Sequence, residues 1–372
     1  MSDQAQLHKR LIHTLADSGN LRTEPWKRAA EEVPRHEFLR GGFFRRVEGA
    51  VPAAWASVPE TDPGWMDACY TDESLVTQIA GTIMPTDIRG QIMRQPTSSS
   101  TLPSLVLRML EDLEIEDGMR VLEIGTGTGY STALLCRRLG EENVTSIEYD
   151  EDVAARARTS LGRLGMHPTL VAGDGLRGYG SGAPYDRVIA TCAVRTIPSA
   201  WIEQTRPGGV ILATIGGWLG SSGLAKLTVR DAGTASGPLL DGEVSFMLAR
   251  PHTPPALGLL PDLSAGSSRP ATFGSDILDD WSARFVVQAA VPGAQRLALQ
   301  HEGQTEDVLV DVGADSWAAL RQQGDHWTVR QGGPESLWDA AERQLKRWRA
   351  AGSPALEDMT VTVTPGGIAY DW

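Results

Sequence analysis

Three glycines at alternate positions, Gly125, Gly127 and Gly129, stand between a predicted strand and a predicted helix. The apolar run 121–124 indicates the strand, and the pattern over 130–139 indicates the helix. Glycine lets the backbone of such a turn adopt conformations that side chains forbid, and it lets a ligand approach closely. The helix N-terminus behind the turn presents free N–H groups and the positive end of a dipole. The segment therefore predicts a binding turn for a ligand with an anionic group.

Two acidic residues follow this turn at the spacing of successive βα units. Glu148 ends the next apolar run, 144–147, where its carboxylate could accept hydrogen bonds from both hydroxyls of a ribose. Asp174 follows a third strand-like run, 169–172, and could receive the amino group of an adenine. Together with the glycines they predict a Rossmann-like nucleoside site.

The spacing of the glycines indicates which cofactor fits. The dinucleotide fingerprint is G-x-G-x-x-G, but this chain has E-x-G-x-G-x-G, and no P-loop lysine follows. With acids ending the first two strands, the pattern resembles the S-adenosyl-L-methionine site of class I methyltransferases. A tight turn without a ligand is the alternative, and the two acids in register argue against it. The candidate cofactor-binding residues are Glu123, Gly125, Thr126, Gly127, Gly129, Tyr130, Glu148, Tyr149, Gly173, Asp174, Gly175 and Thr191.

Composition excludes several functional classes. A net charge of −13 argues against a general nucleic-acid or anionic-membrane partner. The chain has no run of about 18 apolar residues and no signal-peptide pattern at its start. The seven histidines show no metal-ligand spacing, and the three scattered cysteines suit reduced thiols. We therefore expect a cytoplasmic monomer without a metal.

The order of predicted elements indicates an α/β protein. Strand and helix signals alternate over 101–250, as in a doubly wound parallel sheet. The apolar runs 224–229 and 244–249 resemble a finishing antiparallel pair, and the runs 283–290 and 307–312 resemble further strands. We predict four parts: an N-terminal helical, substrate-covering segment (1–100), the core (101–250), a linker (251–271) and a C-terminal α+β extension (272–372).

Several spaced motifs resemble the protein-L-isoaspartate O-methyltransferase family. They include Val33-Pro-Arg-His36, the 121–130 turn, the run PYDRVIATCA at 184–193 and the segment QTRPGG at 204–209. The resemblance covers roughly residues 20–250, with extra sequence between Phe44 and Trp65. It implies a class I methyltransferase core that uses S-adenosyl-L-methionine to esterify a carboxylate of aspartate or isoaspartate in a peptide.

One segment departs from the family pattern. The family carries a T-I-S-x-P motif whose serine contacts the acceptor carboxylate, but this chain has PTSSSTLP at 96–103. Aligning the prolines places Thr101 in the serine position, after Ser98, Ser99 and Ser100. We take these four hydroxyl residues as the candidate catalytic residues. The alternative is that they only cap a helix predicted over 104–113. His36 could line the acceptor site, although a structural role is the more common one for such a histidine.

The acceptor is a peptide in our main interpretation. The serine-rich segment and the C-terminal extension resemble methyltransferases of ribosomal peptide maturation, associated with ATP-grasp (graspetide) or lanthipeptide systems. Those act on an aspartate in a precursor peptide, in some cases after cyclisation, and the ester passes through a succinimide (aspartimide) to isoaspartate. A general isoaspartate repair enzyme is the alternative, and a non-catalytic peptide-binding module is an alternative of another class. A small-molecule methyltransferase would fit the cofactor turn but not the other motifs.

Tryptophan is concentrated near the end of the chain, where six of eleven lie beyond residue 280. Trp338 and Trp348 fall on one side of a helix predicted over 335–350, beside the cationic cluster Lys346, Arg347 and Arg349. We expect this stripe to be the core of a small domain, with a peptide platform as the alternative.

Overall fold

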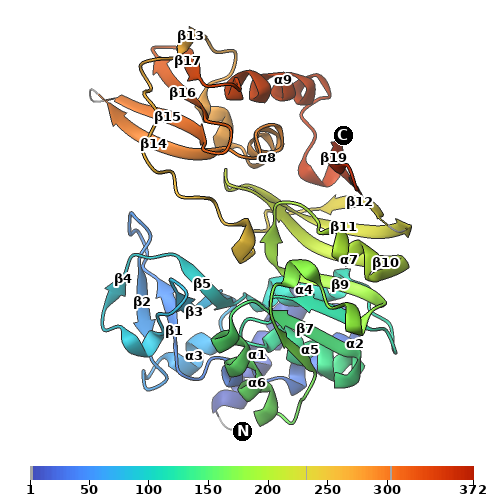
Figure 1. Cartoon of the computed structure of the whole chain (residues 1–372). Coiled ribbons are helices and arrows are strands. Elements are labelled where there is room, and N and C mark those ends of the chain that lie inside the picture. Colours follow the sequence, from blue (N-terminus) through green and yellow to red (C-terminus); the bar gives the residue numbers. More distant parts are fainter. Residues whose placement is uncertain (1–2, 232, 302–303) are drawn as a thin grey trace. The chain divides into compact units, whose positions relative to one another are not determined.

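The computed structural model describes residues 3–231, 233–301 and 304–372 (Figure 1). The chain divides into two compact units, and each is described by itself. The first contains residues 1–191, 198–212 and 228–234 within these limits, and the second contains 192–197, 213–227 and 235–372. The strands β9 (Tyr185–Val194), β10 (Thr205–Gly216), β11 (Ser222–Asp231) and β12 (Thr234–Leu240) contribute residues to both. No described helix is both long and apolar enough to cross a membrane.

The first unit begins with helices that bury one apolar face. In α1 (Asp3–Asp17) the buried residues are Leu7, Leu11, Ile12 and Leu15, which confirms the amphipathic pattern of the sequence. The helix α2 (Glu24–Glu32) packs on α1 and α5, and the short η1 (Arg35–Phe38) follows. These elements bring Arg35 of the VPRH motif next to Ser100 and Thr101.

A five-stranded antiparallel sheet with the order β4-β2-β1-β3-β5 follows in the first unit. The run of serines forms β5, an edge strand that pairs with β3 through Leu75↔Ser100 and Val76↔Ser99. The next helix, α4, begins at Pro103, and its N-cap Leu102 provides no side-chain hydrogen bond. The hydroxyl residues therefore do not cap this helix, and the capping alternative is wrong. The elements are β1 (Phe43–Arg46), β2 (Trp55–Val58), α3 (Trp65–Cys69), β3 (Leu75–Ile79), β4 (Gln91–Ile92), β5 (Pro96–Ser100) and α4 (Pro103–Asp112).

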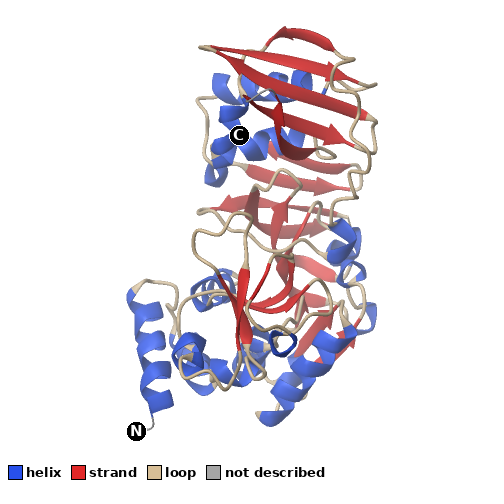
Figure 2. Ribbon diagram, turned by 90° about the vertical axis from the view of Figure 1, so that its left-hand side faces the viewer, coloured by secondary structure: helices blue, strands red, loops and turns tan. Residues whose placement is uncertain are grey.

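Parallel strands form the core of the first unit, as the sequence predicts. The strands β8, β7, β6 and β9 are neighbours in that order, and α5 and α6 pack against β7. Figure 2 shows helices (blue) beside the strands (red) of the protein. Each predicted strand or helix between 121 and 172 lies within a residue or two of its observed bounds. The elements are β6 (Val121–Ile124), α5 (Tyr130–Leu139), β7 (Val144–Glu148), α6 (Glu151–Arg163), β8 (Thr169–Ala172), β9 (Tyr185–Val194), α7 (Ser199–Glu203) and β10 (Thr205–Gly216).

The full hydrogen-bonded order of this sheet is β19-β18-β12-β11-β10-β9-β6-β7-β8. Its last strands are β11 (Ser222–Asp231), β12 (Thr234–Leu240), β18 (Thr360–Thr364) and β19 (Gly367–Asp371). The sequence predicts 244–249 as the antiparallel partner of 224–229, and this is wrong because β12 follows β11 instead. The segment 244–249 forms no strand and joins Ala193 by one isolated parallel bridge to Leu248.

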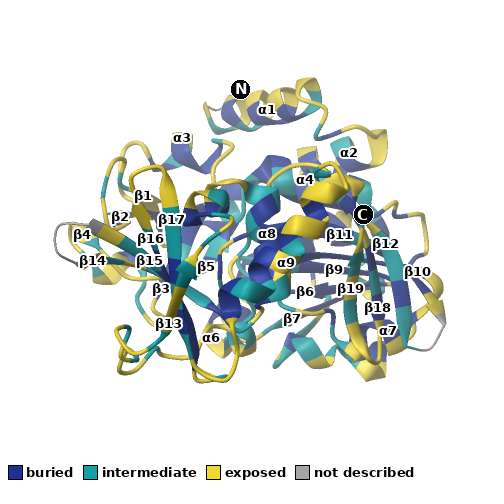
Figure 3. Cartoon of the chain, turned by 90° about the horizontal axis from the view of Figure 1, so that it is seen from above, coloured by how far each residue is buried: buried dark blue, intermediate teal, exposed yellow. Residues whose placement is uncertain are grey.

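The second unit contains a five-stranded antiparallel sheet with the order β13-β17-β16-β15-β14. The helix α9 packs on β16, β17 and α8, and Figure 3 shows buried residues along both helices. The predicted helix over 335–350 and the predicted strand over 307–312 are confirmed within a few residues. The elements are β13 (Ser267–Pro270), α8 (Trp281–Ala290), β14 (Gln295–His301), β15 (Gln304–Asp311), β16 (Ser316–Gln323), β17 (His326–Gly332) and α9 (Leu337–Ala350).

The run 283–290 is a helix, and its prediction as a strand is wrong. The side chain of Asp280 accepts a hydrogen bond from the Ala283 amide at 2.7 Å and caps the helix. Ala283, Val286 and Val287 are buried at the spacing of one helix face. A short apolar run of this length is compatible with either structure, and the cap and the burial pattern favour the helix.

Trp338 and Trp348 of the second unit are core residues, as the sequence predicts. Trp338 and Trp348 are buried, and their indole N–H groups donate to Phe273 O and Pro354 O. The proposed linker 251–271 contains β13, and its Leu257 and Leu263 pack against a cluster that includes Trp317. The division of the chain at 100, 250 and 271 stays a prediction.

Candidate active site

The three glycines form a turn that only glycine adopts without strain. Their φ angles are +94°, +54° and +91° for Gly125, Gly127 and Gly129. A Cβ on Gly125 would lie 2.7 Å from Thr191 Oγ1, and a Cβ on Gly127 would lie 3.3 Å from Ser99 O. The turn therefore passes directly beside the serine strand, although the two belong to different sheets.

The carboxylate of Glu148 lies at this turn. Its Oε2 accepts a hydrogen bond from the Gly127 amide at 2.9 Å, and its Oε1 accepts one from the Asp150 amide at 3.1 Å. The Glu148 carbonyl also accepts from the Gly173 amide at 2.8 Å. The carboxylate is partly exposed and fixed by backbone donors, so it keeps acceptor capacity for hydroxyl groups of a ligand. Its neighbour Tyr149 is half exposed beside it.

Glu123 supports the turn from behind. It is fully buried, and its carboxylate accepts hydrogen bonds from the hydroxyls of Ser131, Thr132 and Ser146. Ser146 also lies 2.6 Å from the Thr126 hydroxyl, so the network reaches the turn itself. Burial raises the pKa of Glu123 above the usual carboxyl value, against the effect of the three hydroxyl donors. With both oxygens bound to protein hydroxyls, Glu123 and Thr126 position the turn.

Asp174 and Gly175 follow β8 at the edge where the cofactor residues meet. The Asp174 carboxylate accepts from the Leu176 amide at 3.0 Å and remains partly exposed. A Cβ on Gly175 would lie 2.6 Å from Ile124 Cγ2, so this position has room only for glycine. The Gly175 carbonyl accepts a hydrogen bond from the buried indole of Trp201 at 2.8 Å, a support that the sequence did not reveal.

Two of the predicted cofactor residues, Thr191 and Tyr130, make contacts within the protein. The Thr191 hydroxyl donates to the carbonyls of Gly125 and Ile124 and so ties β9 to the turn. The Tyr130 side chain is buried against Phe38, and burial raises the pKa of its phenol to about 12. Tyr130 therefore contributes to the core beneath the turn.

Arg35 of the VPRH motif holds the serine strand in place. Its guanidinium is fully buried and donates to the carbonyls of Ser100 and Thr101, both at 3.2 Å, and towards Ser100 Oγ at 3.4 Å. It also donates to three carbonyls of the preceding segment, those of Cys69, Thr71 and Glu73. Burial lowers the pKa of Arg35 to about 10, so the group stays charged at neutral pH.

The hydroxyl residues alternate along β5. Ser98 and Ser100 are buried, whereas Ser99 and Thr101 are partly exposed. Ser98 lies 3.3 Å from the Thr77 hydroxyl, and Ser100 is close to Arg35 as described above. His36 is buried, and its ring contacts Tyr70 Oη at 2.7 Å and Glu37 at 3.2 Å, as expected of a structural histidine.

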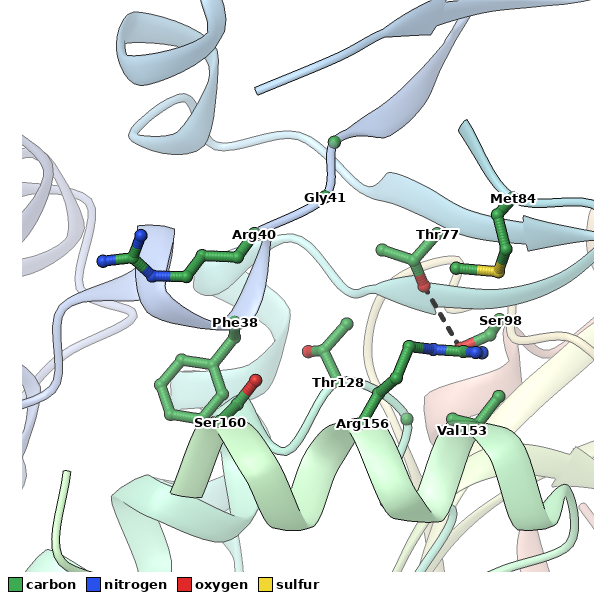
Figure 4. A pocket seen from close by; sticks show the side chains of 12 residues that line it. Phe38, Arg40, Gly41, Thr77, Met84, Ser98, Thr128, Val153, Arg156 and Ser160 are labelled. Atoms are coloured by element: carbon green, nitrogen blue, oxygen red, sulfur yellow. Dashed lines mark hydrogen bonds between the residues drawn. The ribbon is translucent and has the colours of Figure 1, made fainter. Parts of the chain in front are cut away.

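A pocket lies where the serine strand, the glycine turn and α6 meet (Figure 4). Ser98 and Gly127 line it together with polar and apolar residues that the sequence did not single out. The described residues contain no group of three or more side chains suited to hold a metal ion. The further lining residues include Phe38, Arg40, Thr77, Met84, Thr128 and Arg156.

Comparisons with known proteins agree with this geometry. The family model for protein-L-isoaspartate(D-aspartate) O-methyltransferase matches residues 74–237. The protein-L-isoaspartate O-methyltransferase of Methanothermobacter thermautotrophicus is 32% identical over 211 residues, covering 56% of this chain and 79% of that protein. The enzyme of the same name from Thermococcus sibiricus is 30% identical over 221 residues, covering 58% and 82%. The chain belongs to the protein-L-isoaspartate O-methyltransferase family.

A solved protein-L-isoaspartate O-methyltransferase structure has a similar fold. It aligns with a TM-score of 0.57 at 22% identity and covers 98% of this chain and 99% of its own. The chain is thus a carboxyl O-methyltransferase with a class I fold that uses S-adenosyl-L-methionine. Membership excludes the non-catalytic peptide-binding module. The glycine turn, which side chains would fill, and the partly exposed Glu148 fit this cofactor.

Proposed function

We propose that this protein methylates the free carboxylate of an isoaspartyl residue in a protein or peptide. The names of its relatives state this acceptor for them. The observation that carries the proposal is the close approach of the serine strand to Gly127. An acceptor held by β5 would thereby lie beside the turn that holds the cofactor.

In this proposal the side chains position the two reactants, and the methyl donor and the acceptor carboxylate are reactive by themselves. S-adenosyl-L-methionine supplies an activated methyl group on a positively charged sulfur. Gly125 and Gly127 admit it, and Glu148 and Asp174 accept hydrogen bonds from its nucleoside. A carboxylate is already an anionic nucleophile at neutral pH, so no general base is required. Holding the reacting atoms about 3 Å apart in line accounts for much of the rate.

The hydroxyl residues have two roles in this proposal. Ser99 and Thr101 are partly exposed and orient the acceptor carboxylate through charge-assisted hydrogen bonds. Ser100 faces Arg35 and positions the strand, while Ser98 lines the pocket. Neutral hydroxyls suit the reacting oxygen because a cation bound there would withdraw electron density from the nucleophile.

An aspartate in a ribosomally made precursor peptide is the second candidate acceptor. The PTSSSTLP segment, which differs from the family motif, favours it. The C-terminal region does not decide between the two, because the solved relative aligns with 98% of this chain.

Two peptides that differ only in one isoaspartyl or aspartyl linkage test the proposal. Methyl transfer is followed by mass spectrometry, with the Glu148→Ala variant, which should bind the cofactor more weakly, as a control of reduced activity. We expect methylation of the isoaspartyl peptide. Methylation of the aspartyl peptide alone would overturn the proposal in favour of the second candidate.

A further inference from the structure

Arg156 places a cation in the pocket beside the acceptor strand. It lies on α6, and its side chain extends from the helix towards the pocket that Ser98 and Gly127 also line (Figure 4). The residue is exposed, and no carboxylate of the described residues lies within ion-pairing distance of it. A cation without an acidic partner is notable in a chain with a net charge of −13.

The neighbouring arginines are already engaged. Arg40 lines the same pocket but pairs with Glu37 at 2.8 Å and with Glu60 at 3.2 Å. Arg163, two turns further along α6, pairs with Glu37 at 3.3 Å. Arg156 therefore carries the uncompensated charge among these three arginines.

The rest of the pocket suits a peptide segment. Phe38 and Met84 offer apolar contacts, and Thr77, Ser98 and Thr128 offer hydroxyls. Thr77, Met84 and Ser98 come from the region of the small antiparallel sheet, whereas Asp174 lies at the end of β8, outside the residues that line the pocket. The pocket thus extends from the serine strand β5, which is proposed to hold the acceptor.

We propose that Arg156 binds an acidic side chain next to the acceptor residue of the peptide. This inference rests on the proposed function and adds a specificity to it. A neighbouring acid is a better partner than the acceptor carboxylate, because a guanidinium on the reacting carboxylate would weaken the nucleophile. An exposed ion pair of this kind changes kcat/KM by about 1.5- to fivefold and weakens with salt.

Isoaspartyl peptides that carry Glu or Gln at the residues flanking the acceptor provide the test. The variant Arg156→Gln is compared with Arg158→Gln, which removes the same charge from the same helix outside the pocket. We expect the wild type and Arg158→Gln to prefer one Glu peptide through a lower KM, and Arg156→Gln to lose that preference with kcat retained. The variant Arg156→Glu should instead prefer a Lys peptide.

Three outcomes would overturn the inference. The first is that the wild type has equal KM values for the Glu and Gln peptides. The second is that the preference survives in Arg156→Gln. The third is that Arg156→Gln loses affinity for S-adenosylhomocysteine, the demethylated cofactor, as strongly as it loses affinity for the Glu peptide. The last outcome would assign Arg156 to the cofactor. Failure of the wild type to methylate any isoaspartyl peptide would instead refute the proposed function, so the two failures are distinguishable.

Discussion

Replacing Arg35 by lysine tests whether this buried residue positions the acceptor strand. The guanidinium donates to five carbonyls, of which the Thr71 and Glu73 oxygens are the closest at 2.7 Å. A lysine ammonium keeps the charge but has only three donors. At least two of the five carbonyls therefore lose their partner in Arg35→Lys, and the loss is costly where these are the fully buried oxygens of Cys69 and Ser100.

The expected loss follows from that count. Each unsatisfied buried acceptor costs about 1–3 kcal/mol, so unfolding should become easier by about 2–6 kcal/mol. In a unit of this size 1 kcal/mol shifts the melting temperature by about 2–4 °C, which predicts a decrease of at least about 4 °C. The exposed Arg46 provides the matched control, because Arg46→Lys should melt like the wild type.

Activity and cofactor binding should separate in the same variant. Arg35 bonds to the end of β5 and to the segment 69–73, so its loss should lower kcat while S-adenosylhomocysteine affinity by calorimetry stays within about twofold of the wild type. A wild-type melting temperature would refute the hydrogen-bond count. A parallel fall in affinity and kcat would refute the separate positioning of strand and turn.

Three further predictions concern the site itself. Glu148→Ala removes the hydrogen bonds proposed for the ribose hydroxyls, so cofactor affinity by calorimetry should fall about ten- to a hundredfold, and unchanged binding would contradict the assignment. Thr101→Ala should lower kcat with unchanged melting and cofactor affinity, because its hydroxyl is proposed to meet the acceptor; an unaltered rate would remove it from the site. Because burial raises the pKa of Glu123, its contribution to stability is complete below the unfolded-state pKa and is lost as the pH rises through the higher folded-state pKa. The difference in unfolding free energy between the wild type and Glu123→Gln, measured by urea denaturation, should therefore shrink from pH 5 towards neutral, and a difference that grows would show that the hydroxyl donors outweigh burial.

Local signals in the sequence predicted the strand, glycine turn and helix at 121–139 well. Strand, glycine turn and helix are consecutive between 121 and 139, and the hydrogen bonds of such a unit form between near neighbours. The acceptor side depends on contacts between distant residues. Arg35 binds carbonyls up to 66 positions away, and Trp201 binds a carbonyl 26 positions away. No periodicity or spacing encodes these pairs, so the sequence could identify VPRH as a motif without showing what it holds.

The same limit explains the errors in the C-terminal half. The helix α8 depends on a single cap at Asp280 within an apolar run that also fits a strand. Likewise, β12 and not 244–249 pairs with β11, although 244–249 (VSFMLA) is far more apolar than the TASGPLL of β12, so apolar content indicated the wrong partner. Glu123 was grouped with the cofactor residues because it ends a strand, but only the structure shows three hydroxyls around it.

The serine strand belongs to a small sheet of its own, and this arrangement has a consequence for how such an enzyme diversifies. The turn proposed to hold the cofactor lies among β6, α5 and β7, whereas β5 is the last strand of a sheet whose other members are β1 to β4. Insertions in the connections of that small sheet, such as the segment 80–90 that contributes Met84 to the pocket, can reshape the acceptor surface while the glycine turn stays intact. Evolution or engineering can thus exchange the accepted peptide and inherit the methyl donor unchanged.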